Sequence, residues 1–190
     1  DIIVNNAGYT WDDVIQRMSD EQWYAMLDCH MTAPFRILRA AYPVIKAQAQ
    51  ADAAAGREVF RKVVNISSTS GLNGNAGQVN YSGAKAGVTG MTRALAREWG
   101  RLKVNVNAVA FGFILTRMTE ANAKDGATVK IEGRDIRVGV SPEIIASHAQ
   151  RCALGRPGTT EEAAGAVYLF CTPESNYITG QTVAVSGTPQ

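Results

Sequence analysis

Four runs of β-branched and apolar residues, separated by stretches with helical spacing, constrain the fold of this chain most. They lie at residues 1–4, 63–68, 104–110 and 181–187. Short continuous apolar runs are typical of strands that are buried on both faces. Strands that alternate with helices pair in parallel through right-handed crossovers. The sequence therefore predicts an α/β fold, with a parallel sheet between helices on both faces.

Helical spacing follows each of the first three runs. One long helix is expected from Ser19, where Gln22 completes a capping box, with a break or restart near Pro34. The Ala- and Gln-rich residues 47–56 suit an exposed helical extension or a surface insertion. Further helices are expected from Asn80 to about Trp99 and, after a capping sequence at 157–162, over 163–171. Residues 117–150 show the least regular pattern.

Composition narrows the class of protein. The 190 residues suit one domain, and 19 basic against 17 acidic residues give no reason to expect nucleic acid as a partner. No apolar run is long enough to span a bilayer, so we expect no membrane association. The three cysteines form no Cys-x-x-Cys pair, which favours reduced thiols in a cytoplasmic protein and argues against a metal site.

The first residues have an unusual position for a strand. Asp1-Ile2-Ile3-Val4 reads as a buried strand, and Asn5-Asn6-Ala7-Gly8 as the turn that follows it. Chain termini usually lie at the surface, so we expect the sequence to begin inside a longer protein.

Tyr81 and Lys85 are the first candidate reactive pair, because residues four apart share one face of a helix. A free tyrosine has a pKa near ~10, and a neighbouring cation lowers it, so the phenol can exchange a proton near neutral pH. Tyr-x-x-x-Lys alone is weak, since chance produces it in about one chain in three of this length. An exposed helical pair is the alternative.

Candidate site residues also follow two of the predicted strands. Ser68 follows the second run, and ligands of open parallel sheets bind at strand ends. Its hydroxyl can bond a substrate oxygen, although Ser67, Thr69 and Ser70 compete with it as local caps. Asn6-Ala7-Gly8 follows the first run, where small residues let a planar ligand approach the backbone; a simple turn is the alternative.

These motifs together resemble the short-chain dehydrogenase/reductase family, with 3-oxoacyl-(acyl-carrier-protein) reductases as the most similar branch. The resemblance rests on the order and spacing of five motifs: Asn5-Asn6-Ala7-Gly8, Ser68, Tyr81-x-x-x-Lys85, Phe111-Gly112-x-x-x-Thr116 and Ile178-Thr179-Gly180-Gln181. It implies a three-layer Rossmann-like fold, with residues 1–190 as one partial dinucleotide-binding and catalytic domain. Residues 117–150 would be the substrate lid, and their length suggests a substrate with an extended tail.

The resemblance also implies roles. Tyr81 would be the general acid, Lys85 would hold the nicotinamide ribose and lower the pKa of Tyr81, and Ser68 would orient the substrate carbonyl. The residues expected to contact NADP or NAD are Asn6, Ala7, Gly8, Tyr81, Lys85, Ile114 and Thr116. The partners implied are a small-molecule or acyl-thioester substrate and further copies of the chain, in a homotetramer or homodimer.

The sequence departs from the family pattern in three ways. No Gly-x-x-x-Gly-x-Gly loop follows a first strand. The resemblance therefore implies that this sequence lacks the first strands of the fold and the residues that select NAD or NADP. We therefore expect the first strand here to be an uncovered apolar edge, and the isolated chain to be unstable and to bind dinucleotide poorly. Phe111 replaces the family proline before Gly112.

His30 is the third departure, because it replaces the asparagine that holds a water in the family's proton relay. An imidazole can also hold a water, and it titrates near neutral pH. A packed histidine satisfied by the backbone is the alternative. Since related hydroxyacyl-CoA dehydrogenases resemble this chain there, a 3-hydroxyacyl-CoA or hydroxysteroid dehydrogenase is a second possible function. A non-catalytic assembly module is a third, and it predicts a damaged Ser/Tyr/Lys set.

Overall fold

The structure is a computed structural model that describes residues 1–116, 119, 128–131, 133–137 and 139–189. Its central sheet has the order β1-β2-β3-β6, and each neighbouring pair is parallel. The strands are β1 (Ile2–Asn5), β2 (Arg61–Ser68), β3 (Val104–Phe111) and β6 (Thr182–Val185). All four coincide with the predicted runs, so the predicted α/β class is confirmed.

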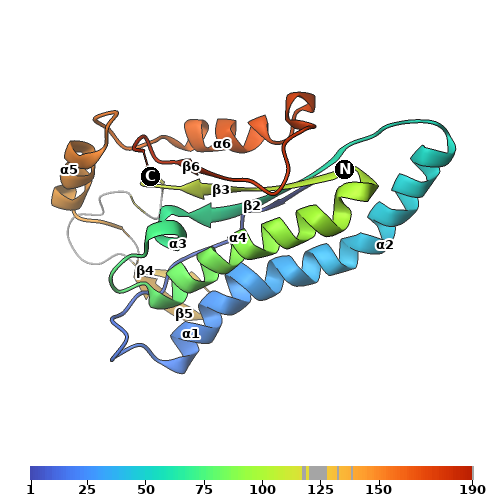
Figure 1. The fold of residues 1–190 in the computed structure, drawn as a ribbon. Helices are drawn as coiled ribbons and strands as arrows, with labels where there is room; N and C mark the ends of the chain where they lie inside the picture. The colour runs from blue at the N-terminus through green and yellow to red at the C-terminus, as the bar shows by residue number, and fades with distance from the viewer. Residues whose placement is uncertain (117–118, 120–127, 132, 138, 190) are drawn as a thin grey trace.

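Helices cover both faces of this sheet. Figure 1 shows α2 and α4 side by side along one face, with α6 along the other. The helical elements are α1 (Asp20–Leu27), η1 (Asp28–Thr32), α2 (Ala33–Ala54), α3 (Thr69–Asn73), α4 (Val79–Trp99), η2 (Gly100–Leu102), α5 (Pro142–Arg151), α6 (Thr160–Leu169) and η3 (Pro173–Ser175). No helix within these described ranges has both the length and the apolarity needed to cross a bilayer.

Side chains that point alternately to the two faces of the sheet divide the core between the two layers of helices. Val63 and Val106 pack with Trp99 at the end of α4, and Val64 packs with Phe170 beside α6. Successive side chains of a strand point to opposite faces, so adjacent residues of one buried strand serve both layers. This explains why the strands read as continuous apolar runs.

The first long helix breaks earlier than its sequence predicts. The chain passes from α1 into a π-helical turn over Asp28–Thr32, and α2 then runs unbroken from Ala33 to Ala54. Pro34 therefore closely follows the π-helical turn within one continuous helical path, and it has no N–H to donate to the preceding turn. His30 lies in the middle of the π-helical turn, a type of irregularity that is frequent at functional sites.

The segment expected to be irregular contains regular structure where it is described. β4 (Thr128–Ile131) and β5 (Arg134–Arg137) form an antiparallel hairpin, and α5 follows at Pro142. Ile136 of this hairpin is 1% exposed and packs with Met26. The expectation of an irregular segment is wrong for these residues. The other residues of the predicted lid, 117–118, 120–127, 132 and 138, lie outside the described residues.

β1 lies at one edge of the described sheet, as expected. Its outer positions are apolar, and Ile2 and Val4 are 52% and 41% exposed. An edge strand of this kind presents unpaired backbone groups and apolar side chains together, which is the arrangement that favours pairing with another strand.

Candidate active site

Ser68, Tyr81 and Lys85 meet at the carboxyl end of β2. Ser68 is the last residue of that strand, and Tyr81 and Lys85 lie one turn apart in α4, which packs on the same strand. The Lys85 Nζ atom lies 5.6 Å from the centroid of the Tyr81 ring. A hydrogen bond between Ser68 and Tyr81 lowers the pKa of the phenol against the effect of burial. The three predicted reactive residues are therefore neighbours.

Two of the three competing hydroxyls, those of Ser67 and Ser70, form hydrogen bonds with groups other than Tyr81. Ser67 Oγ donates to the Lys85 carbonyl at 2.8 Å, and Ser70 Oγ donates to Gln78 Oε1 at 3.1 Å. The Ser68 hydroxyl caps α3 by accepting from the Ser70 N–H at 3.1 Å, while it also contacts Tyr81. Sequence spacing left this choice open, and the strand pleat turns Ser67 toward α4 and leaves Ser68 next to Tyr81.

Burial dominates the electrostatics of the pair. It raises the pKa of Tyr81 above the ordinary 10.0 and lowers the pKa of Lys85 from 10.5 to about 8. The expectation that Lys85 lowers the pKa of Tyr81 is therefore wrong for the protein alone, because the loss of water opposes the phenolate more than its neighbours favour it. Lys85 Nζ instead donates to the Ile66 carbonyl at 2.7 Å.

Asn80 is a site residue that the sequence reasoning missed. It is fully buried, its side-chain amide donates to the carbonyls of Trp11 and Gln22, and its Oδ1 accepts from the Tyr81 N–H at 2.7 Å. These bonds fix the first turn of α4 and with it the backbone of Tyr81. An asparagine directly before the tyrosine, at the start of a helix, was the available signal.

His30 is 2% exposed and packs edge-on against the Tyr81 ring, with ring centroids 5.1 Å apart. Its Nε2 lies 2.8 Å from the Tyr9 carbonyl, which can only accept, so Nε2 carries the proton. Nδ1 is then an acceptor, and it is buried with no partner among the described residues. The backbone thus satisfies one nitrogen of this ring and leaves the other available.

A small cavity of about 10 Å³ lies beside this ring and is lined by His30, Asn65 and Lys85 among others. Such a volume is about the least that holds one water, and polar groups surround it. Burial and the Lys85 ammonium lower the pKa of His30 from 6.5 to about 4. The expectation that His30 titrates near neutral pH is therefore wrong, because a buried imidazole beside a cation stays neutral there.

The predicted cofactor residues lie at two places along the strand ends. Asn6, Ala7 and Gly8 follow β1 and are exposed, and a Cβ on Gly8 would lie 2.7 Å from His30 Cε1. Only glycine therefore lets this loop lie against the His30 ring. Ile114 and Thr116 follow β3, where Ile114 bridges Gly158 and the Thr116 N–H bonds a threonine three residues later.

Known proteins resemble this chain along almost its whole length. A family profile described as enoyl-(acyl carrier protein) reductase matches residues 1–187. The 3-oxoacyl-(acyl-carrier-protein) reductases of Chlamydia muridarum and Vibrio cholerae are 37% and 38% identical to this chain, each over 98% of its length. The chain spans 64% and 65% of the length of these two relatives.

Two solved structures share the fold. A candidate gluconate dehydrogenase from Agrobacterium tumefaciens is 27% identical with a TM-score of 0.79, and 98% of this chain covers 64% of it. A 4-hydroxyisoleucine dehydrogenase mutant complexed with NADH and succinate is 21% identical with a TM-score of 0.81, and 99% of this chain covers 67% of it. The second likeness shows the Rossmann-like fold alone.

Proposed function

The chain belongs to the short-chain dehydrogenase/reductase family, and from that premise we propose that it carries the catalytic residues of an NAD(P)-dependent oxidoreductase. The proposed reaction reduces a carbonyl to a hydroxyl, and the proposed substrate is a 3-oxoacyl thioester. The observation that supports it most is the meeting of Ser68, Tyr81 and Lys85 at one strand end. The substrate class is that of the curated relatives named above.

Each of these residues has a distinct role in the proposed reaction. Tyr81 Oη gives its proton to the carbonyl oxygen, and the raised pKa of the phenol keeps that proton in place until the oxygen becomes basic. Ser68 Oγ lies next to the phenol and orients the same oxygen by a hydrogen bond. Lys85 is held by the Ile66 carbonyl, and with a pKa of about 8 its ammonium can replace the proton that Tyr81 gives up.

The residues at the strand ends fit a dinucleotide. The loop over Asn6, Ala7 and Gly8 is exposed at the end of β1, and the missing side chain of Gly8 lets it lie against His30. Asn6, Ala7, Gly8, Tyr81, Lys85, Ile114 and Thr116 would hold NADP or NAD. When bound, the cofactor supplies the hydride that the carbonyl carbon accepts.

We place His30 in this site as a proton-relay residue. Its Nδ1 is an acceptor without a partner among the described residues, and it borders a cavity that Lys85 also lines. A water in that cavity, held by a hydrogen bond to Nδ1, would give a proton to Lys85 after the lysine has reprotonated Tyr81, and it would itself be reprotonated from solvent. The neutral state of the ring suits this role, since a charged ring would repel the lysine.

Steady-state assays of the native gene product test the proposed function. They measure reduction of acetoacetyl-CoA with NADPH or NADH, and the reverse oxidation. Tyr81→Phe is expected to lower kcat/KM at least about 10³-fold, within the range of general acid catalysis. Tyr24→Phe is the matched control, because Tyr24 is 61% exposed on α1. Full activity of the Tyr81→Phe enzyme would exclude the proposed mechanism.

His30 is the specific observation that favours a second function, that of a 3-hydroxyacyl-CoA or hydroxysteroid dehydrogenase. In that case the oxidative direction with NAD and a 3-hydroxyacyl-CoA or hydroxysteroid would exceed the reduction of acetoacetyl-CoA. An assembly module without activity would show no turnover in either direction. The intact Ser68, Tyr81 and Lys85 speak against that last function.

We also propose that the protein forms a homodimer or homotetramer through α2 and α4. Phe35 and Val44 on α2 are 50% and 59% exposed, and an apolar hollow of about 730 Å³ lies between the two helices. A symmetric partner would cover such a face. Light scattering of the purified protein measures the mass, and a monomer would exclude this arrangement.

A further inference from the structure

A pocket of about 380 Å³ lies beyond the carboxyl ends of β2, β3 and β6. Strand register aligns Ser68 with Phe111 and Phe111 with Val185, so the residues that follow these three surround one space. Ser70 from α3, Phe113 after β3 and Thr188 after β6 are among its lining residues. The pocket is therefore beside the catalytic serine, and its volume lies within the range of ligand sites.

The charged groups of this pocket are all basic. Its lining includes Arg151, Arg156 and His148, and no aspartate or glutamate lies among the described lining residues. The ring of His148 stacks on Phe113 with centroids 4.4 Å apart, which gives the pocket one flat apolar wall. The remaining groups are mostly hydroxyls and side-chain amides. Such a lining suits an anionic oxygen group at the end of a short carbon chain.

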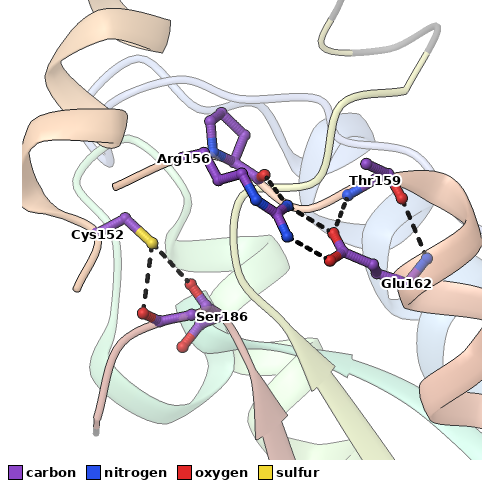
Figure 2. Close-up of polar contacts among 7 residues, drawn as sticks. Cys152, Arg156, Thr159, Glu162 and Ser186 are labelled. Carbon is purple, nitrogen blue, oxygen red and sulfur yellow. Dashed lines mark hydrogen bonds and ion pairs between the residues drawn. The ribbon is translucent and has the colours of Figure 1, made fainter. Parts of the chain in front are cut away.

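Arg156 is already neutralised. Its two terminal nitrogens lie 2.8 and 2.6 Å from the two Glu162 carboxylate oxygens, and one of them also donates to the Pro157 carbonyl. Figure 2 shows this pair together with the capping box between Glu162 and Thr159, and Cys152 against the chain at Ser186. The pair fixes the segment between α5 and α6 as a wall of the pocket.

Arg151 has a different environment. Its Nε lies 3.3 Å from the Ser147 carbonyl one turn earlier in α5, and no carboxylate pairs with it within the described residues. The guanidinium is therefore a cation with terminal nitrogens available to a ligand. Arginine binds carboxylate and phosphate oxygens through two parallel hydrogen bonds, which gives selectivity as well as affinity.

We propose that this pocket receives the acyl portion of the substrate and that Arg151 selects substrates that bear a carboxylate or phosphate oxygen group on that portion. The inference rests on the proposed function, because the pocket is taken to continue from the carbonyl held by Ser68. It narrows the substrate class from 3-oxoacyl thioesters in general to those whose acyl portion carries an anionic group.

Calorimetric titration of the native gene product, with and without saturating NADPH, tests this assignment. The probes are levulinate, its neutral methyl ester and 2-oxopropylphosphonate. At least one anion is expected to bind about tenfold more tightly than the ester, and Arg151→Gln is expected to remove that advantage. Arg93→Gln is the matched control, because Arg93 is an exposed arginine of α4 that lines neither this pocket nor the hollow between α2 and α4.

The outcomes separate the two proposals. Tighter binding of levulinate alone, of the phosphonate alone, or of both identifies the anion, and each supports the assignment if Arg151→Gln abolishes it while Arg151→Lys keeps part of it. Equal affinity for acid and ester, no binding of any probe, or an unchanged Arg151→Gln variant overturns it. Anion binding that depends on Arg151 without turnover of any ketone would contradict the proposed function and the acyl assignment with it, and would leave only an anion site at Arg151.

Discussion

The buried imidazole of His30 should make the folded protein sensitive to mild acid. Its pKa is lowered from 6.5 to about 4, so between these pH values an unfolded chain binds a proton that the folded chain does not. The free energy of unfolding therefore falls as the pH falls through this interval. The interval is about 2.5 pH units, which at about 1.36 kcal/mol per unit corresponds to about 3 kcal/mol.

The His30→Asn variant measures this contribution directly. Urea unfolding of both proteins at a series of pH values between about 7.5 and 4 gives two stability curves. Loss of the Tyr9 hydrogen bond and of packing offsets the curves at every pH. Only the missing titration changes their shape, so the variant is expected to lose about 3 kcal/mol less than the natural chain across the interval.

Two parallel curves would refute the reasoning, because they would mean that His30 titrates alike in the folded and unfolded chains. His148→Asn is the control, since His148 is only half-buried on α5. Burial and Arg151 also lower the pKa of His148. Its replacement is expected to change the shape of the curve less than replacement of His30 does.

Three other predictions concern stability. The pKa of Lys85 is lowered from 10.5 to about 8, so unfolding free energy should rise with pH between these values, and Lys85→Met should remove the rise in denaturant titrations. Lys62 is 4% exposed and donates to Asn105, Ser175 and Asn176, so Lys62→Met should cost about 3 kcal/mol of unfolding free energy in urea; a change below about 1 kcal/mol would contradict this network. Thr159→Ala removes the N-cap of α6 and should lower stability by about 1 kcal/mol in the same assay, whereas Thr160→Ala, one residue later, should change it little.

Local pattern was enough for most of the secondary structure. The strands were found because burial on both faces leaves continuous β-branched runs, and the capping box at Ser19 marked the start of α1. The helix expected over 163–171 begins three residues earlier, at Thr160, because Thr159 and Glu162 form its capping box.

The π-helical turn at 28–32 was missed, because the stretches before and after it each keep helical spacing and no local signal separates a π-helical turn from an α-helical one. The hairpin of β4 and β5 was missed because its burial comes from contacts of Ile136 with residues more than a hundred positions earlier.

The candidate site divides in the same way. The spacing of Tyr81 and Lys85 in one helix and the position of Ser68 at a strand end could be derived from the sequence, because both are local properties. The choice of Ser68 over Ser67 depended on the pleat of β2 and on the Lys85 carbonyl that bonds Ser67. The role of Asn80 depended on carbonyls of Trp11 and Gln22, which no local pattern connects to it.

The sequence by itself determined the α/β class and the candidate pair of Tyr81 and Lys85, because hydrophobic period and spacing within one helix are local properties of the chain. Tertiary structure alone decided the charge states of those residues. The protonation of Tyr81, Lys85 and His30 depends on how much water the surrounding elements remove and on which distant carbonyls they bring near. Desolvation is a property of three-dimensional packing, so no spacing of residues predicts it.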